Sequence, residues 1–153
     1  MSVYLHKSHN VSVLLYHIVC PAKYRRIVIS NAVDKTLKEC CEEIEKRYEI
    51  NFLEIGTEGD HVHFLVQSVP TYSPTRIVTI IKSILAREIF QKHPEVKKQL
   101  WGGEFWSDGY FMSTVSKYGN EEVIKRYVIS QGAENRYKQL SKKQLELFDG
   151  LCN

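Results

Sequence analysis

The sequence predicts an α+β fold in which helices pack against one face of an antiparallel sheet. Short segments rich in β-branched and aromatic residues alternate with two long amphipathic segments, which is typical of this fold class. No Pro/Gly/Ser-rich linker interrupts the chain, and 153 residues with 43% hydrophobic content are enough for one cooperative core. We therefore expect residues 1–153 to form a single domain.

A strand and a helix are predicted first. Residues 12–20 are rich in Val, Leu, Tyr and Ile and end at Pro21, as a strand does when it closes before a turn. Apolar side chains then recur at helical spacing over residues 31–48, which indicates an amphipathic helix. Ser30 or Asn31 is the expected N-cap, because either side chain can accept a hydrogen bond from the first helical turn.

Two strands joined by a tight turn come next. Residues 50–57 and 61–69 are both strand-like in composition. Gly59 and Asp60 lie between them and have the composition of a hairpin turn. We therefore expect these two strands to pair with each other.

The second half of the chain repeats the alternation. Residues 73–92 are predicted to form a helix, because their apolar side chains recur at helical spacing and a proline stands in the first turn. Pro94 is expected to end this helix. Residues 110–116 are a strand candidate, residues 120–135 look helical, and a short helix is expected over 141–148. This order of elements predicts a ferredoxin-like, or RRM-like, sandwich with an additional C-terminal helix.

Composition argues against membrane and secreted proteins. The longest apolar run, residues 11–20, is far shorter than the roughly 20 residues of a membrane-spanning helix, and residues 1–10 do not resemble a secretion signal. We expect a cytoplasmic protein without a membrane segment. The net charge of +3 permits nucleic-acid binding without requiring it.

The cysteines stand at spacings that fit neither a CxxC zinc pair nor a secreted disulfide framework, so we expect buried or idle thiols. They are Cys20, Cys40, Cys41 and Cys152.

Two histidines flank Val62 inside a predicted strand. Alternate strand residues point to the same face, so His61 and His63 can both reach one metal ion while Val62 enters the core. Neutral histidine is a common metal ligand, but two histidines at this spacing also occur by chance in many proteins. The remaining histidines have no obvious same-face partner and are assigned to structure or solvent; they are His6, His9, His17 and His93.

Tyr127 and Gln131 form a second pair. They are four residues apart in the helix predicted over 120–135, so they lie about one turn apart on one face. A tyrosine in an amphipathic helix is usually a core or boundary residue, so the pair alone does not indicate catalysis. Tyr24, Tyr118 and Tyr137 lack such a glutamine.

Four stretches, in this order, carry a resemblance to a known family. They are residues 7–11 with 16–19 and 23–26, the motif Asp60-His61-Val62-His63, the aromatic stretch 105–115, and Tyr127-Val128-Ile129-Ser130-Gln131. On these stretches the chain resembles the HUH-type single-tyrosine transposases of small insertion sequences, the IS200-like transposases, from about Tyr4 to Asn135. Two segments depart from the usual family spelling, residues 20–22 and 116–118.

The resemblance implies a metal-dependent endonuclease and strand transferase for single-stranded DNA. Tyr127 would attack a phosphodiester to give a 5′-phosphotyrosine and a free 3′-hydroxyl. His61, His63 and Gln131 would hold a divalent ion. The three ligands are neutral and include no thiolate, which favours Mg2+, with Mn2+ as the alternative.

The resemblance also implies partners. The family binds single-stranded DNA hairpins at the ends of mobile elements and forms homodimers with shared active sites, in which Tyr127 of one subunit completes the metal site of the other. Phosphate contacts are expected from basic residues, although exposed cations are more often simply solvated. The candidates are Lys23, Arg25, Arg26, Lys82 and Arg87.

Three alternatives remain open from the sequence. A non-catalytic module that binds single-stranded nucleic acid through its sheet would tolerate Tyr127→Phe. A domesticated relative would retain cleavage but process chromosomal repeat hairpins. A relaxase or replication initiator of the broader HUH class is disfavoured, because those chains are generally much larger.

Overall fold

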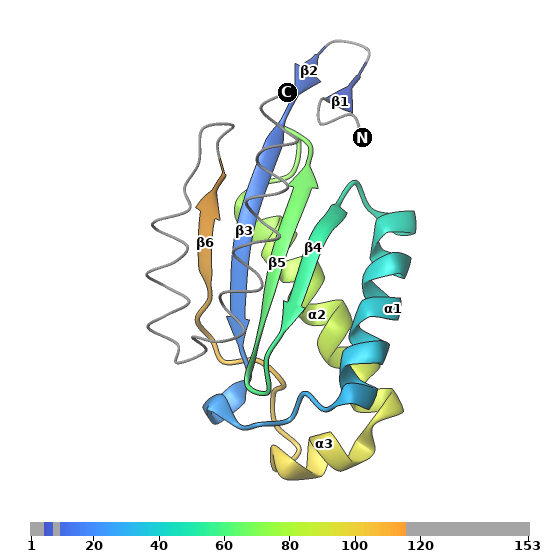
Figure 1. Ribbon diagram of the computed structural model, residues 1–153, viewed down its shortest axis with the longest axis vertical. Helices are drawn as coiled ribbons and strands as arrows, with labels where there is room; N and C mark the ends of the chain where they lie inside the picture. Colours follow the sequence, from blue (N-terminus) through green and yellow to red (C-terminus); the bar gives the residue numbers. More distant parts are fainter. Residues whose placement is uncertain (1–4, 8–9, 116–153) are drawn as a thin grey trace.

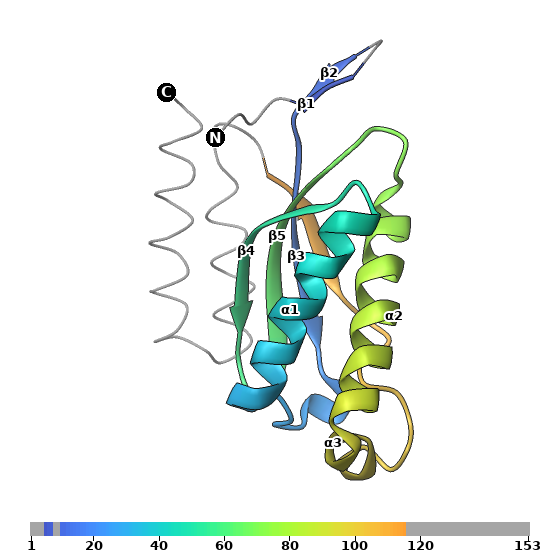
Figure 2. The same ribbon diagram turned by 90° about the vertical axis from the view of Figure 1, so that its right-hand side faces the viewer.

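The computed structural model describes residues 5–7 and 10–115 (Figure 1). Its four-stranded sheet consists of β3 (Leu14–Pro21), β4 (Asn51–Thr57), β5 (His61–Ser68) and β6 (Phe111–Thr114). Two long helices, α1 (Asn31–Arg47) and α2 (Pro74–Lys92), cover one face of this sheet (Figure 2). The short elements are β1 (Leu5–His6), β2 (Val11–Ser12), the 3-10 turn η1 (Lys23–Arg25) and α3 (Pro94–Gln99).

The strands lie in the order β4-β5-β3-β6, and all three pairings are antiparallel. Each long helix connects two strands that are separated by one other strand: α1 joins β3 to β4 across β5, and α2 joins β5 to β6 across β3. This is the split arrangement of a ferredoxin-like fold, so the predicted fold class is confirmed. The helices predicted over 120–135 and 141–148 lie outside the described residues.

The ends of the long helices follow from their sequence. Ser30 Oγ accepts a hydrogen bond from the Val33 amide, and Ser73 Oγ accepts one from the Arg76 amide, so each helix begins at a side-chain cap. Pro94 does more than follow the end of α2, because it occupies the first turn of α3. Proline fits that position because an amide in the first turn has no partner within the helix.

The two faces of the sheet carry alternate residues. Ile18, Cys20, Val62 and Phe64 belong to the core that packs beneath α1 and α2. The residues between them in sequence therefore belong to the opposite face, and several of these are also buried. The site described below lies on that opposite face.

The thiols within the described residues behave as predicted. Cys20, Cys40 and Cys41 are buried and free, and Cys152 lies outside the described residues. Burial raises the pKa of Cys20 to about 12, against a smaller lowering effect of Lys82, and raises that of Cys40 to about 11. Within the described part of the chain, no helix is both long enough and apolar enough to span a membrane.

Candidate metal centre

His61 and His63 lie side by side at the beginning of β5, on the sheet face turned away from α1 and α2. Their ring centroids are 4.9 Å apart, and the side chains are almost fully buried, with 1% and 3% exposed. Val62, between them, is in the core beneath the helices. The alternation predicted from the sequence therefore brings both imidazoles to one place.

Asp60 orients the first of these rings. One Asp60 carboxylate oxygen lies 2.7 Å from His61 Nδ1, and the other accepts bonds from Arg25 Nε and an Arg25 terminal nitrogen at 3.1 and 3.0 Å. Burial by itself raises the pKa of Asp60, but the bonds from His61 and Arg25 outweigh it and hold that pKa below its usual value.

The carboxylate is therefore ionised and can only accept, so His61 Nδ1 must carry the proton. That tautomer leaves Nε2 as the nitrogen of His61 that can ligate a metal, which is the carboxylate–histidine arrangement common beside bound metals. The sequence places Asp60 before the motif but does not show this role.

His63 has the properties of a neutral ligand. Burial, followed by the positive charges that His17 and His61 would carry, holds the pKa of His63 well below its usual value. Its Nε2 is buried and has no hydrogen-bond partner among the described residues. A buried nitrogen without a partner is costly unless an ion or water satisfies it, so the donor set fits a divalent ion.

Two histidines do not complete a metal site. Within residues 5–7 and 10–115, no group of three His, Cys, Asp or Glu side chains is placed to hold an ion. The third ligand expected from the sequence, Gln131, lies outside the described residues, as does Tyr127. Their roles stay predictions.

The expectation that His17 lacks a same-face partner is wrong. His17 lies in β3 diagonally across from His63, and the two ring centroids are 5.5 Å apart. The side chain is fully buried, and neither ring nitrogen has a hydrogen-bond partner in the part of the chain that the structure describes. Burial lowers the pKa of His17 to about 4. The pairing of β3 with β5, which brings the two rings together, is not visible in the local sequence.

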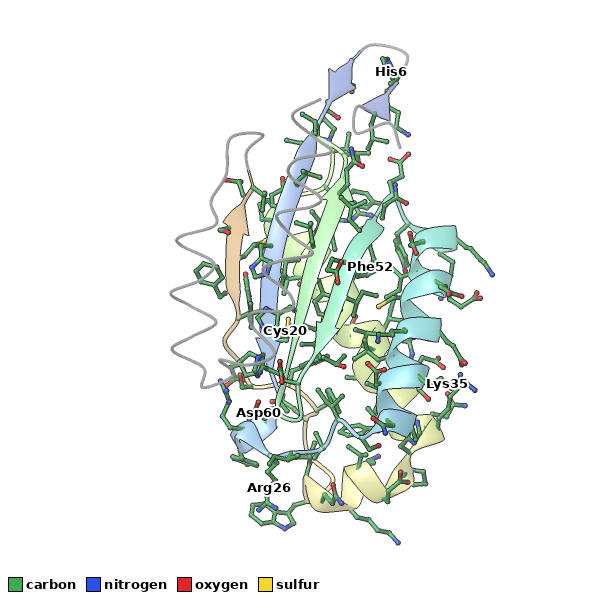
Figure 3. The ribbon with its side chains drawn as sticks, viewed as in Figure 1. His6, Cys20, Arg26, Lys35, Phe52 and Asp60 are labelled. Atoms are coloured by element: carbon green, nitrogen blue, oxygen red, sulfur yellow. The ribbon has the colours of Figure 1, made fainter. Side chains whose placement is uncertain are left out.

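The predicted phosphate contacts fall into two groups. Lys23, Arg25 and Arg26 lie in or next to η1, directly after the end of β3, where Arg25 contacts Asp60. Figure 3 shows Arg26 at the same end of the molecule as Asp60.

The other two candidates, Lys82 and Arg87, lie on α2, against the opposite face of the sheet. Lys82 Nζ donates a 2.9 Å bond to the Ser107 carbonyl, which gives it a partner within the protein.

Comparison with known proteins extends beyond the described residues. The sequence profile of the family described as "Transposase IS200 like" matches residues 10–131. The ISDra2 transposase TnpA of Deinococcus radiodurans is 31% identical over 118 residues, which cover 77% of this chain and 84% of that protein. The transposase for insertion sequence element IS200 of Salmonella typhimurium is 30% identical over 131 residues, which cover 82% of each chain.

A solved structure agrees with these relatives. The crystal structure of a transposase candidate from Deinococcus radiodurans R1 matches this fold with a TM-score of 0.69 and 27% identity, over 86% of this chain and 98% of that chain. The family match over residues 10–131 includes the histidine pair and extends through Tyr127 to Gln131. This chain therefore belongs to the IS200-like transposase family.

Proposed function

We propose that this transposase cuts and rejoins single-stranded DNA through a covalent link between Tyr127 and a 5′-phosphate. Family membership makes DNA cleavage and strand transfer its class of reaction. The observation that carries the proposal is the oriented histidine pair. Two buried imidazoles share one sheet face, and the Asp60 carboxylate fixes the tautomer of His61.

His61, His63 and Gln131 would hold a divalent ion, with Mg2+ expected and Mn2+ as the alternative. When bound, such an ion supplies Lewis-acid charge to a non-bridging oxygen of the scissile phosphate. Neutral ligands leave that charge available to the phosphate. The thiol of Cys20, the cysteine of β3, belongs to the opposite sheet face, and the Gln131 amide would add an oxygen of the kind that Mg2+ and Mn2+ prefer, whereas the two imidazoles would also bind zinc.

Tyr127 would supply the nucleophile. Its phenolate oxygen would bond to phosphorus while the bond from phosphorus to the 3′-oxygen breaks, and the leaving oxygen would take up a proton. The phosphotyrosine conserves the phosphodiester energy. A second 3′-hydroxyl could then attack it, seal the DNA and release Tyr127 without ATP.

The proposed substrates are single-stranded hairpins at the ends of a mobile element, and the proposed assembly is a homodimer with shared active sites. The two curated relatives are transposases of insertion sequences, which supports a mobile-element substrate. The strand that is cut would reach the sheet face that carries the histidine pair and the end of β3, where Lys23, Arg25 and Arg26 lie.

The experiment is a search for a covalent protein–DNA adduct. The wild-type protein and Tyr127→Phe are incubated with end-labelled hairpin DNA from the flanks of the gene, with Mg2+ or with chelator, and run on a denaturing gel. We expect a metal-dependent adduct in the wild type and none in Tyr127→Phe. Tyr118→Phe is the matched control, because Tyr118 has no glutamine four residues on.

Each outcome separates the proposal from its alternative. An adduct that persists in Tyr127→Phe would assign the nucleophile to another residue. Tight hairpin binding without any adduct in the wild type would overturn the catalytic proposal and favour a non-catalytic binding module. Adduct formation with chromosomal repeat hairpins, and none with element ends, would identify a domesticated processing enzyme.

A further inference from the structure

Two exposed aromatic side chains meet at the end of the sheet beside the candidate metal centre. Tyr24, in η1, is 62% exposed, and Trp101, just after α3, is 73% exposed. Their ring centroids are 5.7 Å apart with an interplanar angle of 51°. Single exposed apolar side chains are normal on a soluble surface, whereas exposed side chains that contact one another indicate a binding surface. The pair comes from segments far apart in the sequence, so the fold itself brings them together.

The backbone holds both residues in place at a conformational cost. Tyr24 has φ of 58° and Trp101 has φ of 57°, in the left-handed region that non-glycine residues seldom occupy. Backbone hydrogen bonds fix this geometry: the Lys23 amide donates to the Phe105 carbonyl at 2.8 Å, and the Trp101 amide to the Lys98 carbonyl at 3.0 Å. At Trp101 the left-handed backbone is the usual C-terminal cap of a helix, here α3, whereas strain of the kind seen at Tyr24 concentrates at functional sites.

Cations accompany each ring. Lys23 Nζ lies 5.5 Å from the centre of the Tyr24 ring, and the Arg26 guanidinium lies 4.6 Å from the centre of the Trp101 ring. Aromatic faces next to cations are what proteins use to bind single-stranded nucleic acid, because bases stack on the rings while phosphates meet the charges. The chemistry of the pair therefore fits a nucleotide.

A chain of contacts links the pair to the candidate metal centre. Arg25, the residue after Tyr24, binds Asp60, and Asp60 in turn binds His61. In Figure 3, Arg26 and Asp60 lie at the same end of the molecule. The aromatic pair and the histidine pair therefore lie at the same end of the sheet.

We propose that Tyr24 and Trp101 form a stacking platform for an unpaired base of single-stranded DNA close to the cleaved phosphate. This inference rests on the proposed function, because it places the platform on the path of the strand that is cut. Lys23 and Arg26 support it by neutralising the adjoining phosphates.

The test measures binding of a fluorescein-labelled dT16 oligonucleotide by anisotropy over a series of salt concentrations. We expect Trp101→Ala and Tyr24→Ala each to weaken binding on the order of tenfold without changing the salt dependence, because stacking releases no counterions. Trp101→Phe should restore most of the affinity. Arg26→Gln should instead reduce the slope of log Kd against log salt by about 1.

Tyr72→Ala is the matched control. Arg76 lies 4.4 Å from the centre of the Tyr72 ring, so the pair has similar chemistry, but it follows the far end of β5. Tyr72→Ala should bind dT16 as the wild type does. Intrinsic fluorescence adds a second readout, because Trp101 is exposed and the other tryptophan, Trp106, is buried, so dT16 should quench the wild type and not Trp101→Phe.

Three results would overturn the platform. The first is a dT16 affinity of both Trp101→Ala and Tyr24→Ala that stays within twofold of the wild type. The second is a loss of dT16 affinity in Tyr72→Ala as large as that in Trp101→Ala. The third is a weakened self-association of Trp101→Ala in sedimentation with unchanged DNA affinity, which would assign the pair to a contact between copies. Failure of the proposed function would give a different result. The wild type would form no covalent adduct, but it would still bind dT16, and this binding would still depend on Trp101.

Discussion

Asp60 decides which nitrogen of His61 is available to a metal ion. Its ionised carboxylate accepts a hydrogen bond from His61 Nδ1–H, and Asp60→Asn would replace that acceptor with an amide that can present either oxygen or nitrogen. We expect Asp60→Asn to weaken Mn2+ binding roughly 10- to 100-fold, as the loss of such partners does elsewhere. Electron paramagnetic resonance of Mn2+ titrated into the protein measures this directly.

The control for this variant is Asp108→Asn. Asp108 is highly exposed, and its carboxylate lies 3.9 Å from Lys23 Nζ. It is not the carboxylate that is bonded to His61. Its replacement should leave Mn2+ affinity unchanged. Equal Mn2+ affinity in the Asp60→Asn variant and the wild type would remove the orienting role from Asp60.

His17 should make the metal-free protein sensitive to acid. Burial lowers its pKa from 6.5 to about 4. Between these two pH values His17 is therefore protonated in the unfolded chain and neutral in the folded chain. Stability from this group is thus fully present above about pH 6.5 and is lost as pH falls toward 4, by roughly 3 kcal/mol over the whole interval.

The variant His17→Leu should flatten this dependence. Urea unfolding in chelator between pH 4.5 and 7 should show a smaller loss of stability in His17→Leu than in the wild type. At pH 7 the variant should be as stable or more stable, because it replaces a buried imidazole whose nitrogens have no partner among the described residues. The exposed His6 serves as control through His6→Gln. Parallel pH curves for wild type and His17→Leu would contradict the prediction.

At the scale of elements, the side chain of Lys82 connects α2 to the segment before β6. Lys82 Nζ donates to the Ser107 carbonyl, and Trp106 Nε1 donates to the Lys82 carbonyl at 2.9 Å. We expect Lys82→Met to lower the free energy of unfolding by about 1–2 kcal/mol, because a bond to a charged donor is lost. Its effect on dT16 affinity should be small.

Arg87→Met is the comparison on the same helix. Arg87 is exposed, so this variant should change stability by no more than about 0.5 kcal/mol. Denaturant unfolding measures the effect of both variants on stability, and anisotropy measures their effect on DNA binding. Together the two measurements separate a structural role of Lys82 from a phosphate contact. Weaker DNA binding with a reduced salt slope and unchanged stability in Lys82→Met would make Lys82 a phosphate contact after all.

The sequence predicts the long elements better than the short ones. α1 and α2 end within a residue of their expected limits, because apolar spacing and the serine caps mark them. The short elements β1, β2 and α3 are too brief to show a period, and Pro94 is compatible with both an end and a beginning.

The residues of the candidate site also differ in how well the sequence predicts them. His61 and His63 are visible because strand alternation is local. His17 joins them only through the pairing of β3 with β5, and the bonds of Asp60 depend on the turn that places Arg25 nearby. Contacts between segments distant in sequence therefore limit what the residues alone can predict.

At the scale of the whole molecule, the sheet separates the hydrophobic core from the candidate metal centre. The face beneath α1 and α2 holds the main hydrophobic core, and the other face holds the histidines. The basic turn and the exposed aromatic pair lie beyond one end of the strands. A site at the rim of a packed sheet can thus use costly features, such as left-handed backbone at Tyr24, without disturbing the core.

The shared active site proposed for the homodimer can be tested by mixing two inactive variants. If Tyr127 acts in trans, a mixed dimer of Tyr127→Phe and His63→Ala has one complete site, built from His61 and His63 of the first chain and Tyr127 of the second. Equal mixing after subunit exchange should then restore about a quarter of wild-type adduct, since about half of the dimers are mixed and one of their two sites is complete. If Tyr127 acts in cis, every site in the mixture carries a defect and no adduct forms. Each variant alone, treated identically, is the control, and adduct size on the gel identifies which chain carries the DNA if one chain is tagged.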